Sequence, residues 1–394
     1  MEFRIEAHRD RMRAVDDAER GEARDAIRAL ARPRRTGSAG AAEVEAELRR
    51  RFEGLGYTIQ ELPFTFSAWP GRYGVPAAGA VGLLGLGVGS LALARREPLL
   101  ALAGLGGAAA LIAFAGLYAT RAIAHLPWGR VRGVNWLVHR PGARPRHLVA
   151  AHRDSKSQPI STFLRVAAVV LAGFAWVALA ALAAIGLVDE TLISTPLVLA
   201  LGALGGVGAA LLIACHAGNA SPGALDNATG LAALLGIARR ERNRSDVAFL
   251  VTDAEELGLA GARDVARRLP PVEGIINLDG LDDVGTFRVA ERIGIYRRRV
   301  LAPHLAAALL ASAESLRIPI QRRDLPAGVL VDHIAFGRAG YPAVTVLRGG
   351  ARSLLRVHRP GDTADRLDGT GVAMAVALVC GALELLRGRA GRMR

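Results

Sequence analysis

Four long stretches without a charged side chain stand out in this chain of 394 residues. Asp, Glu, Lys and Arg are all absent from residues 75–94, 98–118, 166–188 and 197–215. Each stretch approaches the roughly 20 apolar residues that an α-helix needs to cross a bilayer. Helices buried in the core of a large soluble protein are the alternative, but four such stretches rich in Leu, Ala, Val and Gly favour the membrane. The pattern therefore predicts four transmembrane helices.

Short polar turns join these stretches in pairs, at residues 95–97 and 189–196. Two α-hairpins result, and each returns the chain to the side of the membrane from which it came. Residues 1–56 are densely charged and contain no apolar core of a signal peptide. Flanking positive residues, including Lys156, lie mainly on the side of the remaining chain, which the positive-inside rule places in the cytoplasm. The sequence thus predicts an integral membrane protein with a cytoplasmic soluble part.

Outside the hairpins, the hydrophobic pattern alternates between strand and helix. Strands are expected at residues 57–66, 133–139, 148–152, 247–252, 274–279 and 343–347, and helices at residues 20–32, 41–55, 228–240, 257–269, 301–316 and 369–387. This alternation indicates parallel strands with helices on both faces of the sheet. The predicted fold is an α/β three-layer sandwich with a central, mainly parallel mixed sheet, interrupted by the two transmembrane α-hairpins.

The same pattern divides the chain into six segments. They are a charged N-terminal helix or extension at 1–24, the start of the α/β domain at 25–74, the first transmembrane hairpin at 75–120, a continuation of the α/β domain at 121–159, the second hairpin at 160–216 and the main part of the domain at 217–390. The predicted domain is therefore assembled from separate stretches of chain.

Composition narrows the possible partners. With 51% hydrophobic residues the chain is not mainly disordered, and its 2 cysteines, both in apolar runs, form no disulfide framework. The net charge of +14 is typical of nucleic-acid binding, but it comes almost entirely from arginines spread over many segments without interleaved aromatic residues. We therefore expect no nucleic-acid partner. Because several arginines lie beside the apolar stretches, a lipid bilayer is the expected partner.

Acidic and histidine side chains gather where predicted strands end. They are His152 and Asp154 after one strand, Glu255 and Glu256 after another, Asp279 at the end of a third, Asp226 at the start of a helix and His358 in a loop. Each alone is explained as a turn, a helix cap or a strand end. Because the carboxyl ends of parallel strands meet at one edge of a sheet, we expect these side chains to lie together. Two imidazoles, three carboxylate ligands and one further carboxylate suit a pair of borderline-soft divalent ions, zinc above all.

The order of these motifs resembles the co-catalytic di-zinc aminopeptidases of metallopeptidase family 28. The stretches that carry the resemblance are AHRDS at 151–155, PGALDNATG at 222–230, AEELGL at 254–259, NLD at 277–279 and HRPGDT at 358–363, with RTGSAG at 35–40, LGY at 55–57 and DH at 332–333 as further similar parts. The resemblance covers nearly all of the chain outside the hairpins. As an ordered set the motifs are specific, although each is weak alone.

The resemblance implies a zinc-exopeptidase-like fold and a role for each position. Two co-catalytic Zn²⁺ ions are implied, one held by His152 and Asp279, the other by Glu256 and His358, with Asp226 bridging both. Glu255 is implied to be the general base, which takes a proton from the attacking water and passes it to the leaving amine. Asp154 is implied to orient His152. The predicted activity is removal of N-terminal residues from a peptide substrate.

One large departure from the family pattern concerns the second hairpin, which separates His152 from Asp226. In soluble relatives the resemblance implies a short connection there. The hairpin therefore replaces a loop beside the metal site, and we expect the active site to face the membrane surface.

Several alternatives to an aminopeptidase stay open. They are a catalytically inactive relative that acts as a membrane scaffold or binding protein, a transporter, a carboxypeptidase and a glutaminyl-cyclase-like acyltransferase. The expected residue type fills every metal and base position, which argues against an inactive relative. No ionisable side chain lies within the four apolar stretches, which argues against a transporter. A fold resemblance does not decide the substrate, and the sequence indicates no oligomeric state.

Overall fold

The computed structural model describes residues 17–294, 299–325 and 329–390. The chain forms two compact units, each assembled from separate stretches. Unit 1 comprises Met1–Thr65, Val131–Lys156 and Asn219–Arg394, and unit 2 comprises Phe66–Arg130 and Ser157–Gly218. Within the predicted N-terminal extension, residues 1–16 lie outside the described residues.

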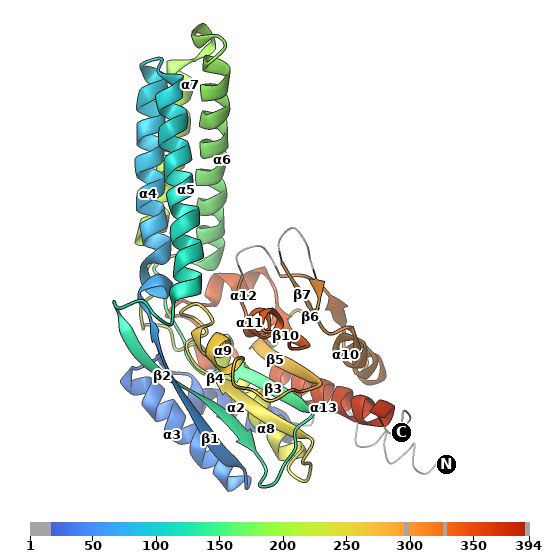
Figure 1. Cartoon of the computed structure of the whole chain (residues 1–394). Coiled ribbons are helices and arrows are strands. Elements are labelled where there is room, and N and C mark those ends of the chain that lie inside the picture. Colours follow the sequence, from blue (N-terminus) through green and yellow to red (C-terminus); the bar gives the residue numbers. More distant parts are fainter. Residues whose placement is uncertain (1–16, 295–298, 326–328, 391–394) are drawn as a thin grey trace. The chain divides into compact units, whose positions relative to one another are not determined.

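Among the described residues of unit 1, eight strands form one sheet in the order β1-β2-β4-β3-β5-β10-β6-β9 (Figure 1). The strands are β1 (Thr58–Ser67), β2 (Arg130–His139), β3 (His147–His152), β4 (Val247–Thr252), β5 (Gly274–Leu281), β6 (Thr286–Ala290), β9 (Ile320–Arg322) and β10 (Ala343–Gly349), with β7 (Arg292–Ile293) and β8 (Arg299–Val300) forming a separate pair. In the centre, β3 pairs in parallel with β4 and β5, and β5 with β10, whereas β2 and β6 pair antiparallel to their inner neighbours. The predicted central, mainly parallel mixed sheet is confirmed.

Helices cover both faces of this sheet. In unit 1 they are α2 (Asp17–Leu30), α3 (Ala39–Gly54), α8 (Thr229–Arg240), α9 (Ala260–Val265), α10 (Pro303–Leu316), α11 (Asp332–Arg338), α12 (Ala351–Arg356) and α13 (Thr370–Ala390), with the short turns η2 (Ala224–Ala228) and η3 (Ala364–Arg366). Alternate residues of a strand point to opposite faces. Accordingly, Val149 and Ala151 of β3 pack with α2, α8 and α13, whereas Leu148 and Ala150 pack with α9 and α11. The unit is thus a three-layer sandwich.

The observed elements differ from the sequence prediction mainly where they are short. The helix predicted at 257–269 is shorter in the structure, where α9 ends at Val265. It begins only at Ala260, because Gly258 and Leu259 have φ values of 101° and 58°, which no α-helix accommodates. Strands β6 and β9 and helix α11 were not predicted. Each is too short to produce a recognisable hydrophobic period.

Unit 2 contains the four predicted apolar helices, which pack side by side. They are α4 (Trp69–Ala94), α5 (Pro98–Ala122), α6 (Thr162–Gly186) and α7 (Thr195–Ala214), with the short turn η1 (Glu190–Leu192). Helix α4 packs against α5 and α7, and α6 packs against the same two helices. A β-carbon at Gly79 would lie 2.9 Å from the carbonyl oxygen of Ala209, and one at Gly208 would lie 2.7 Å from that of Ala168. Glycine therefore allows these helix backbones to approach closely.

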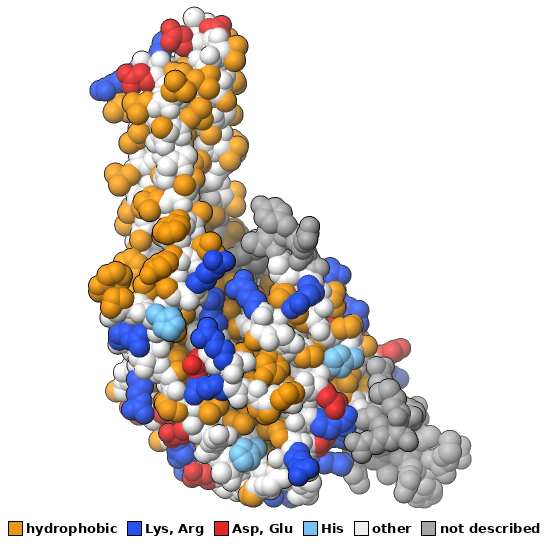
Figure 2. Space-filling view, viewed as in Figure 1, with side chains coloured by type: hydrophobic (Ala, Val, Ile, Leu, Met, Phe, Trp, Pro, Cys, Tyr) orange, Lys and Arg blue, Asp and Glu red, His pale blue; other side chains and the backbone are white. Residues whose placement is uncertain are grey.

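Large apolar side chains cover the outside of these four helices (Figure 2). Leu99, Phe114 and Val177 are exposed, and charged residues of this unit's turns lie at 95–97 and 189–190. Among the described residues, five helices are long and apolar enough to cross a membrane: α4, α5, α6, α7 and the Thr370–Gly388 part of α13. Helix α13 belongs to unit 1, where it packs against α8 and α10.

Candidate metal centre

Three parallel strands and two loops bring the predicted ligands to one edge of the sheet. His152 ends β3, Asp279 lies in β5, Glu255 and Glu256 follow β4, Asp226 lies in η2 and His358 follows α12. Strands β3 and β4 pair in parallel with His152 opposite Thr252. The residues that follow β4 therefore emerge beside His152, as the carboxyl ends of parallel strands do.

The five predicted ligands form two groups that share one carboxylate. Nε2 of His152 lies 3.1 Å from Oδ1 of Asp226 and 3.7 Å from Oδ1 of Asp279. Nε2 of His358 lies 3.0 Å from Oδ2 of Asp226 and 3.2 Å from Oε2 of Glu256. Within each group the potential ligand atoms all lie within 4.8 Å of one another. Asp226 offers a different oxygen to each group, as a bridging ligand does.

The donor atoms fit zinc. Each group combines one imidazole nitrogen with two carboxylates, and these are ligand types that Zn²⁺ takes in proteins. Nε2 of His152 and Oε1 of Glu256 are buried, and neither makes a hydrogen bond of regular geometry to a described residue. Buried polar atoms without a hydrogen bond are rare and indicate a further role, such as metal ligation.

The side chains of this cluster strongly shift one another's protonation. Burial acts to lower the pKa of His152, but the neighbouring carboxylates, Glu255 foremost, outweigh it and raise this pKa well above its usual value. Burial, opposed by His152 and reinforced by Glu256, raises the pKa of Glu255 well above its usual value. A buried carboxyl group with a raised pKa suits proton transfer in catalysis.

Asp154 contacts both His152 and the pair of glutamates. Its carbonyl oxygen lies 3.1 Å from Nδ1 of His152, and its carboxylate lies 3.5 Å from the same nitrogen. The carboxylate also accepts hydrogen bonds from the backbone N–H groups of Glu255 at 3.0 Å and Glu256 at 3.1 Å. Asp154 is thus placed to position two glutamates as well as the histidine that the sequence prediction assigned to it.

Asp362 and Gly223 hold the segment that carries Asp226. The Asp362 carboxylate accepts hydrogen bonds from the N–H groups of Leu225 at 2.9 Å and Asp226 at 3.2 Å. Gly223 has a φ of 58°, and a β-carbon there would lie 2.5 Å from the carbonyl oxygen of Asp226, so only glycine fits. The Asp226–Asn227 peptide bond is cis.

Arg34 is a buried residue of this site that the sequence prediction missed. Its Nε donates to the carbonyl oxygen of Arg153 at 2.6 Å, and Nη1 and Nη2 donate to those of Pro222 at 2.5 Å and Gly223 at 2.9 Å. Burial, opposed by nearby carboxylates such as Asp154, lowers the pKa of Arg34 to about 10. The guanidinium therefore joins the segments that carry His152 and Asp226. Its position just before the RTGSAG motif was the only sequence signal.

Two further residues lie closer to the cluster than the sequence indicated. Lys156, interpreted as a residue flanking the hairpins, places Nζ 2.6 Å from Oε2 of Glu256, the oxygen that also faces His358. Asp332, which belonged to a similar family motif but to no predicted role, accepts a hydrogen bond from the Thr252 hydroxyl at 2.5 Å. Burial raises the pKa of Asp332 to about 7, against the opposing effect of His152.

Comparison with known proteins places this arrangement in a wider context. Residues 203–383 match the model of Peptidase family M28. That stretch contains Asp226, Glu255, Glu256, Asp279 and His358. Among curated proteins, none matches the chain.

Several solved structures share the fold at low sequence identity. The glutaminyl cyclase of Fimbriiglobus ruber is 17% identical, with a TM-score of 0.54 over 93% of this chain and 94% of its own. An aminopeptidase from Aneurinibacillus sp. strain AM-1 is 14% identical, with a TM-score of 0.53 over 94% of each chain. BSAP, a zinc aminopeptidase from Bacillus subtilis, is 14% identical, with a TM-score of 0.54 over 92% of this chain and 94% of its own. The resemblance to peptidase family M28 is confirmed, and the fold is the one shared by these zinc aminopeptidases and glutaminyl cyclases.

Proposed function

We propose that the chain is a membrane-anchored, zinc-dependent aminopeptidase that hydrolyses N-terminal residues from peptides. The observation that carries this proposal is the pair of ligand groups that share Asp226, with Glu255 buried beside them. The match to Peptidase family M28 and the likeness to zinc aminopeptidases support hydrolytic chemistry on peptides.

In this proposal each predicted residue has a defined task. His152 and Asp279 would hold one Zn²⁺, and Glu256 and His358 would hold a second, with Asp226 shared between them. When bound, zinc polarises the scissile carbonyl and makes water more acidic at neutral pH. Glu255 accepts the proton of the attacking water and delivers it to the leaving amine. Asp154 orients His152, from whose Nδ1 its carboxylate lies 3.5 Å away, and it also holds Glu255 through the backbone hydrogen bond of 3.0 Å.

Hydrolysis of a panel of aminoacyl chromogenic amides tests the proposal. The full chain is purified in detergent and supplied with zinc, and each amide is offered with a free and with a blocked N-terminus. We expect cleavage of the free substrates only, because an aminopeptidase recognises the free amine. Cleavage of blocked substrates to the same extent would contradict the assignment as an aminopeptidase.

Glu255→Gln is the matched control, because it removes the proton acceptor and keeps the size of the side chain. We expect its bound zinc, measured by elemental analysis, to equal that of the unmodified chain. Turnover should fall by roughly 10²–10⁴-fold, the usual contribution of general acid–base catalysis. Unchanged turnover would remove Glu255 from the catalytic role, and lost zinc would make it a ligand.

A glutaminyl-cyclase-like acyl transfer is the second candidate, because glutaminyl cyclases share the fold at comparable TM-scores. A peptide with an N-terminal glutamine distinguishes the two reactions. A cyclase releases ammonia and leaves a pyroglutamyl peptide, whereas an aminopeptidase releases free glutamine. Absence of both products, together with inactivity on the amide panel, would favour an inactive scaffold or binding protein.

We also propose that α4, α5, α6 and α7 cross the membrane as two hairpins, and that unit 1 lies in the cytoplasm. The exposed apolar side chains of these helices support this, as does the arrangement of flanking positive residues. Helix α13 is not counted because it packs inside unit 1. Protease added to inside-out vesicles should digest unit 1, whereas protease added to intact cells should not. The reverse pattern would place unit 1 on the other side.

A further inference from the structure

A hollow of about 650 Å³ lies beside the loop that carries His358. Its lining includes four arginines, two aspartates and one leucine: Arg352, Arg356, Arg359, Arg366, Asp282, Asp283 and Leu355. We call this hollow the arginine pocket. The predicted metal ligands are not part of its lining, so it is a separate place on unit 1.

The two aspartates of the arginine pocket are engaged in local structure. Asp282 accepts hydrogen bonds from the hydroxyl of Ser353 at 2.7 Å and from the N–H of Asp283 at 2.8 Å. Asp283 accepts hydrogen bonds from the N–H groups of Asp368 at 2.6 Å and Gly371 at 2.8 Å. Their carboxylates therefore hold neighbouring loops and neutralise the pocket only in part.

Three of the four arginines, by contrast, lack close hydrogen-bond acceptors among the described residues. Arg352 and Arg366 are exposed, and neither makes a hydrogen bond or salt bridge with a described residue. In Arg356, Nε and Nη2 are buried and make no hydrogen bond within the described part of the chain. Their nearest carboxylate oxygens belong to Asp362 at 3.5 Å and Asp282 at 3.6 Å, which is long for a charged hydrogen bond.

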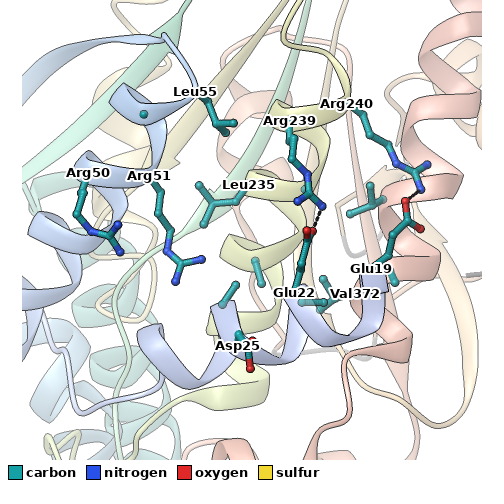
Figure 3. Close-up of a pocket in the computed structure, with 17 residues that line it drawn as sticks. Glu19, Glu22, Asp25, Arg50, Arg51, Leu55, Leu235, Arg239, Arg240 and Val372 are labelled. Carbon is teal, nitrogen blue, oxygen red and sulfur yellow. Dashed lines mark hydrogen bonds and ion pairs between the residues drawn. The ribbon is translucent and has the colours of Figure 1, made fainter. Parts of the chain in front are cut away.

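Another hollow of unit 1 shows the opposite arrangement (Figure 3). It has a volume of about 450 Å³ and lies among α2, α3, α8 and α13. There, Arg239 forms a salt bridge with Glu22, and Arg240 forms one with Glu19. These positive charges are compensated within the chain, so that hollow offers no comparable site for an anion.

We propose that the arginine pocket binds a phosphate oxyanion, supplied either by a lipid headgroup or by free phosphate. The planar guanidinium group donates two parallel hydrogen bonds to phosphate oxygens, and several such groups around one hollow suit a tetrahedral anion. Leu354 and Leu355 of α12 are 41% and 51% exposed beside these arginines. Apolar side chains next to phosphate-binding groups suit an amphiphile, which favours a lipid as the source.

Arg356 connects the arginine pocket to the predicted metal centre. Its Nε lies near Asp362, whose carboxylate holds the N–H groups of Leu225 and Asp226. An anion that attracts Arg356 would therefore act on the segment that carries Asp226. The inference itself does not depend on peptidase activity, since it concerns a separate ligand.

Binding to the metal-free full chain tests this inference, because phosphate would otherwise associate with zinc. Calorimetric titration with inorganic phosphate, at constant ionic strength in chloride, measures the free-phosphate arm. Thermal unfolding in phosphatidylcholine nanodiscs with and without phosphatidic acid measures the lipid arm. The variant R352Q/R366Q removes two arginines that have no catalytic role. The double variant R144Q/R242Q removes two exposed arginines outside the pocket and matches the charge change.

We expect saturable phosphate binding that weakens on the order of tenfold or more in R352Q/R366Q and is retained in R144Q/R242Q. A rise in unfolding temperature with phosphatidic acid that R352Q/R366Q abolishes would identify a lipid headgroup as the source. Arginine-dependent phosphate binding without that rise would identify free phosphate. Equal binding and equal unfolding temperatures in both double variants, or no response to either probe, would overturn the inference.

Discussion

Polar and charged side chains lie deep inside unit 1, whereas large apolar side chains cover the outside of unit 2. Arg34, His152 and Asp332 are each at most 1% exposed, while Leu99 and Phe114 are 71% and 68% exposed. Burying a charge costs free energy unless it is paired or binds a metal. Large exposed apolar patches are uncommon on soluble proteins. Unit 1 therefore buries more charge than an ordinary soluble domain, and the proposed metal centre explains this. Unit 2 exposes more apolar surface than such a domain, and the proposed bilayer explains that.

Helix α13 shows why this comparison needs a structure. Its apolar window has a mean hydropathy of 1.7, close to the 1.9 of α4. In α13, however, 61% of that window is buried within the chain, against 44% in α4 and 11% in α5. By composition and length, five helices of the described chain could cross a membrane. Only the burial of their side chains by the rest of the chain distinguishes a core helix from a helix that needs an apolar environment.

The largest expected effect comes from removing the buried charge at Arg34. Arg34→Met leaves four backbone carbonyls without this donor and removes a buried positive charge that lies among the carboxylates of the site. Breaking such a buried charged network costs about 3–5 kcal/mol. We expect the free energy of unfolding of unit 1, measured by proteolysis in urea, to fall by this amount. Zinc affinity, measured by competition with a chelator, should fall as well.

Arg28→Met is the matched control, because Arg28 is an exposed arginine of α2. Exposed substitutions away from special features change stability by less than about 0.5 kcal/mol. If Arg34→Met unfolded at the same urea concentration as Arg28→Met, the guanidinium would not hold the two ligand-bearing segments together. Reduced stability with normal zinc affinity would make Arg34 purely structural.

A second prediction compares one leucine of α13 with one valine of the bundle. Leu378 is 0% exposed and Val177 is 69% exposed. Leu378→Ala should cost about 2–5 kcal/mol, since it removes buried contacts and leaves a cavity. Val177→Ala in detergent should cost well under about 1 kcal/mol, because most of its side chain contacts the surrounding amphiphile rather than the chain. Urea unfolding of both variants in the same detergent measures the difference, and equal costs would refute the distinction between the two helices.

The parts of the fold that sequence predicted correctly depend on local patterns. Apolar runs of helix length predicted α4 to α7, and the alternation of short apolar runs with helices predicted the parallel core of β3, β4 and β5. The three-residue β9 and the position of β6 beside β10 depend on partners far along the chain. No periodicity within such short segments specifies those partners.

The candidate site divides in the same way. Ordered motifs predicted five residues that the structure brings into two groups, and strand ends explain why they meet. Arg34 escaped prediction because three of its four acceptors lie 119, 188 and 189 positions away in the chain. Lys156 was interpreted from its neighbours in sequence, whereas its contact is with Glu256, 100 positions later. Residues whose role comes from distant backbone atoms carry no local signal.

The smallest expected effect concerns the buried histidine at the start of β3. Burial lowers the pKa of His147 to about 4. The carboxylates of Glu273 and Asp246 act to raise this pKa, whereas the positive charges of Arg146 and His304 lower it further. The unfolded chain, with a pKa near 6.5, therefore binds more protons between these values. The contribution of His147 to the free energy of unfolding is therefore fully present above pH 6.5. It decreases as the pH falls toward 4, and the loss is about 2 kcal/mol at pH 5.

Comparing the unmodified chain with His147→Gln isolates this contribution from the other titrating groups. Between pH 7.5 and pH 5, the free energy of unfolding of the unmodified chain should fall by about 2 kcal/mol more than that of the variant. The exposed His125→Gln serves as a control and should follow the unmodified chain. His333, whose pKa burial also lowers to about 4, should give a difference of the same sign. Identical pH dependence in the unmodified chain, His147→Gln, His125→Gln and a His333→Gln variant would show that unit 1 does not keep these buried imidazoles neutral. The contrast between its polar interior and the apolar surface of unit 2 would then rest on the metal centre alone.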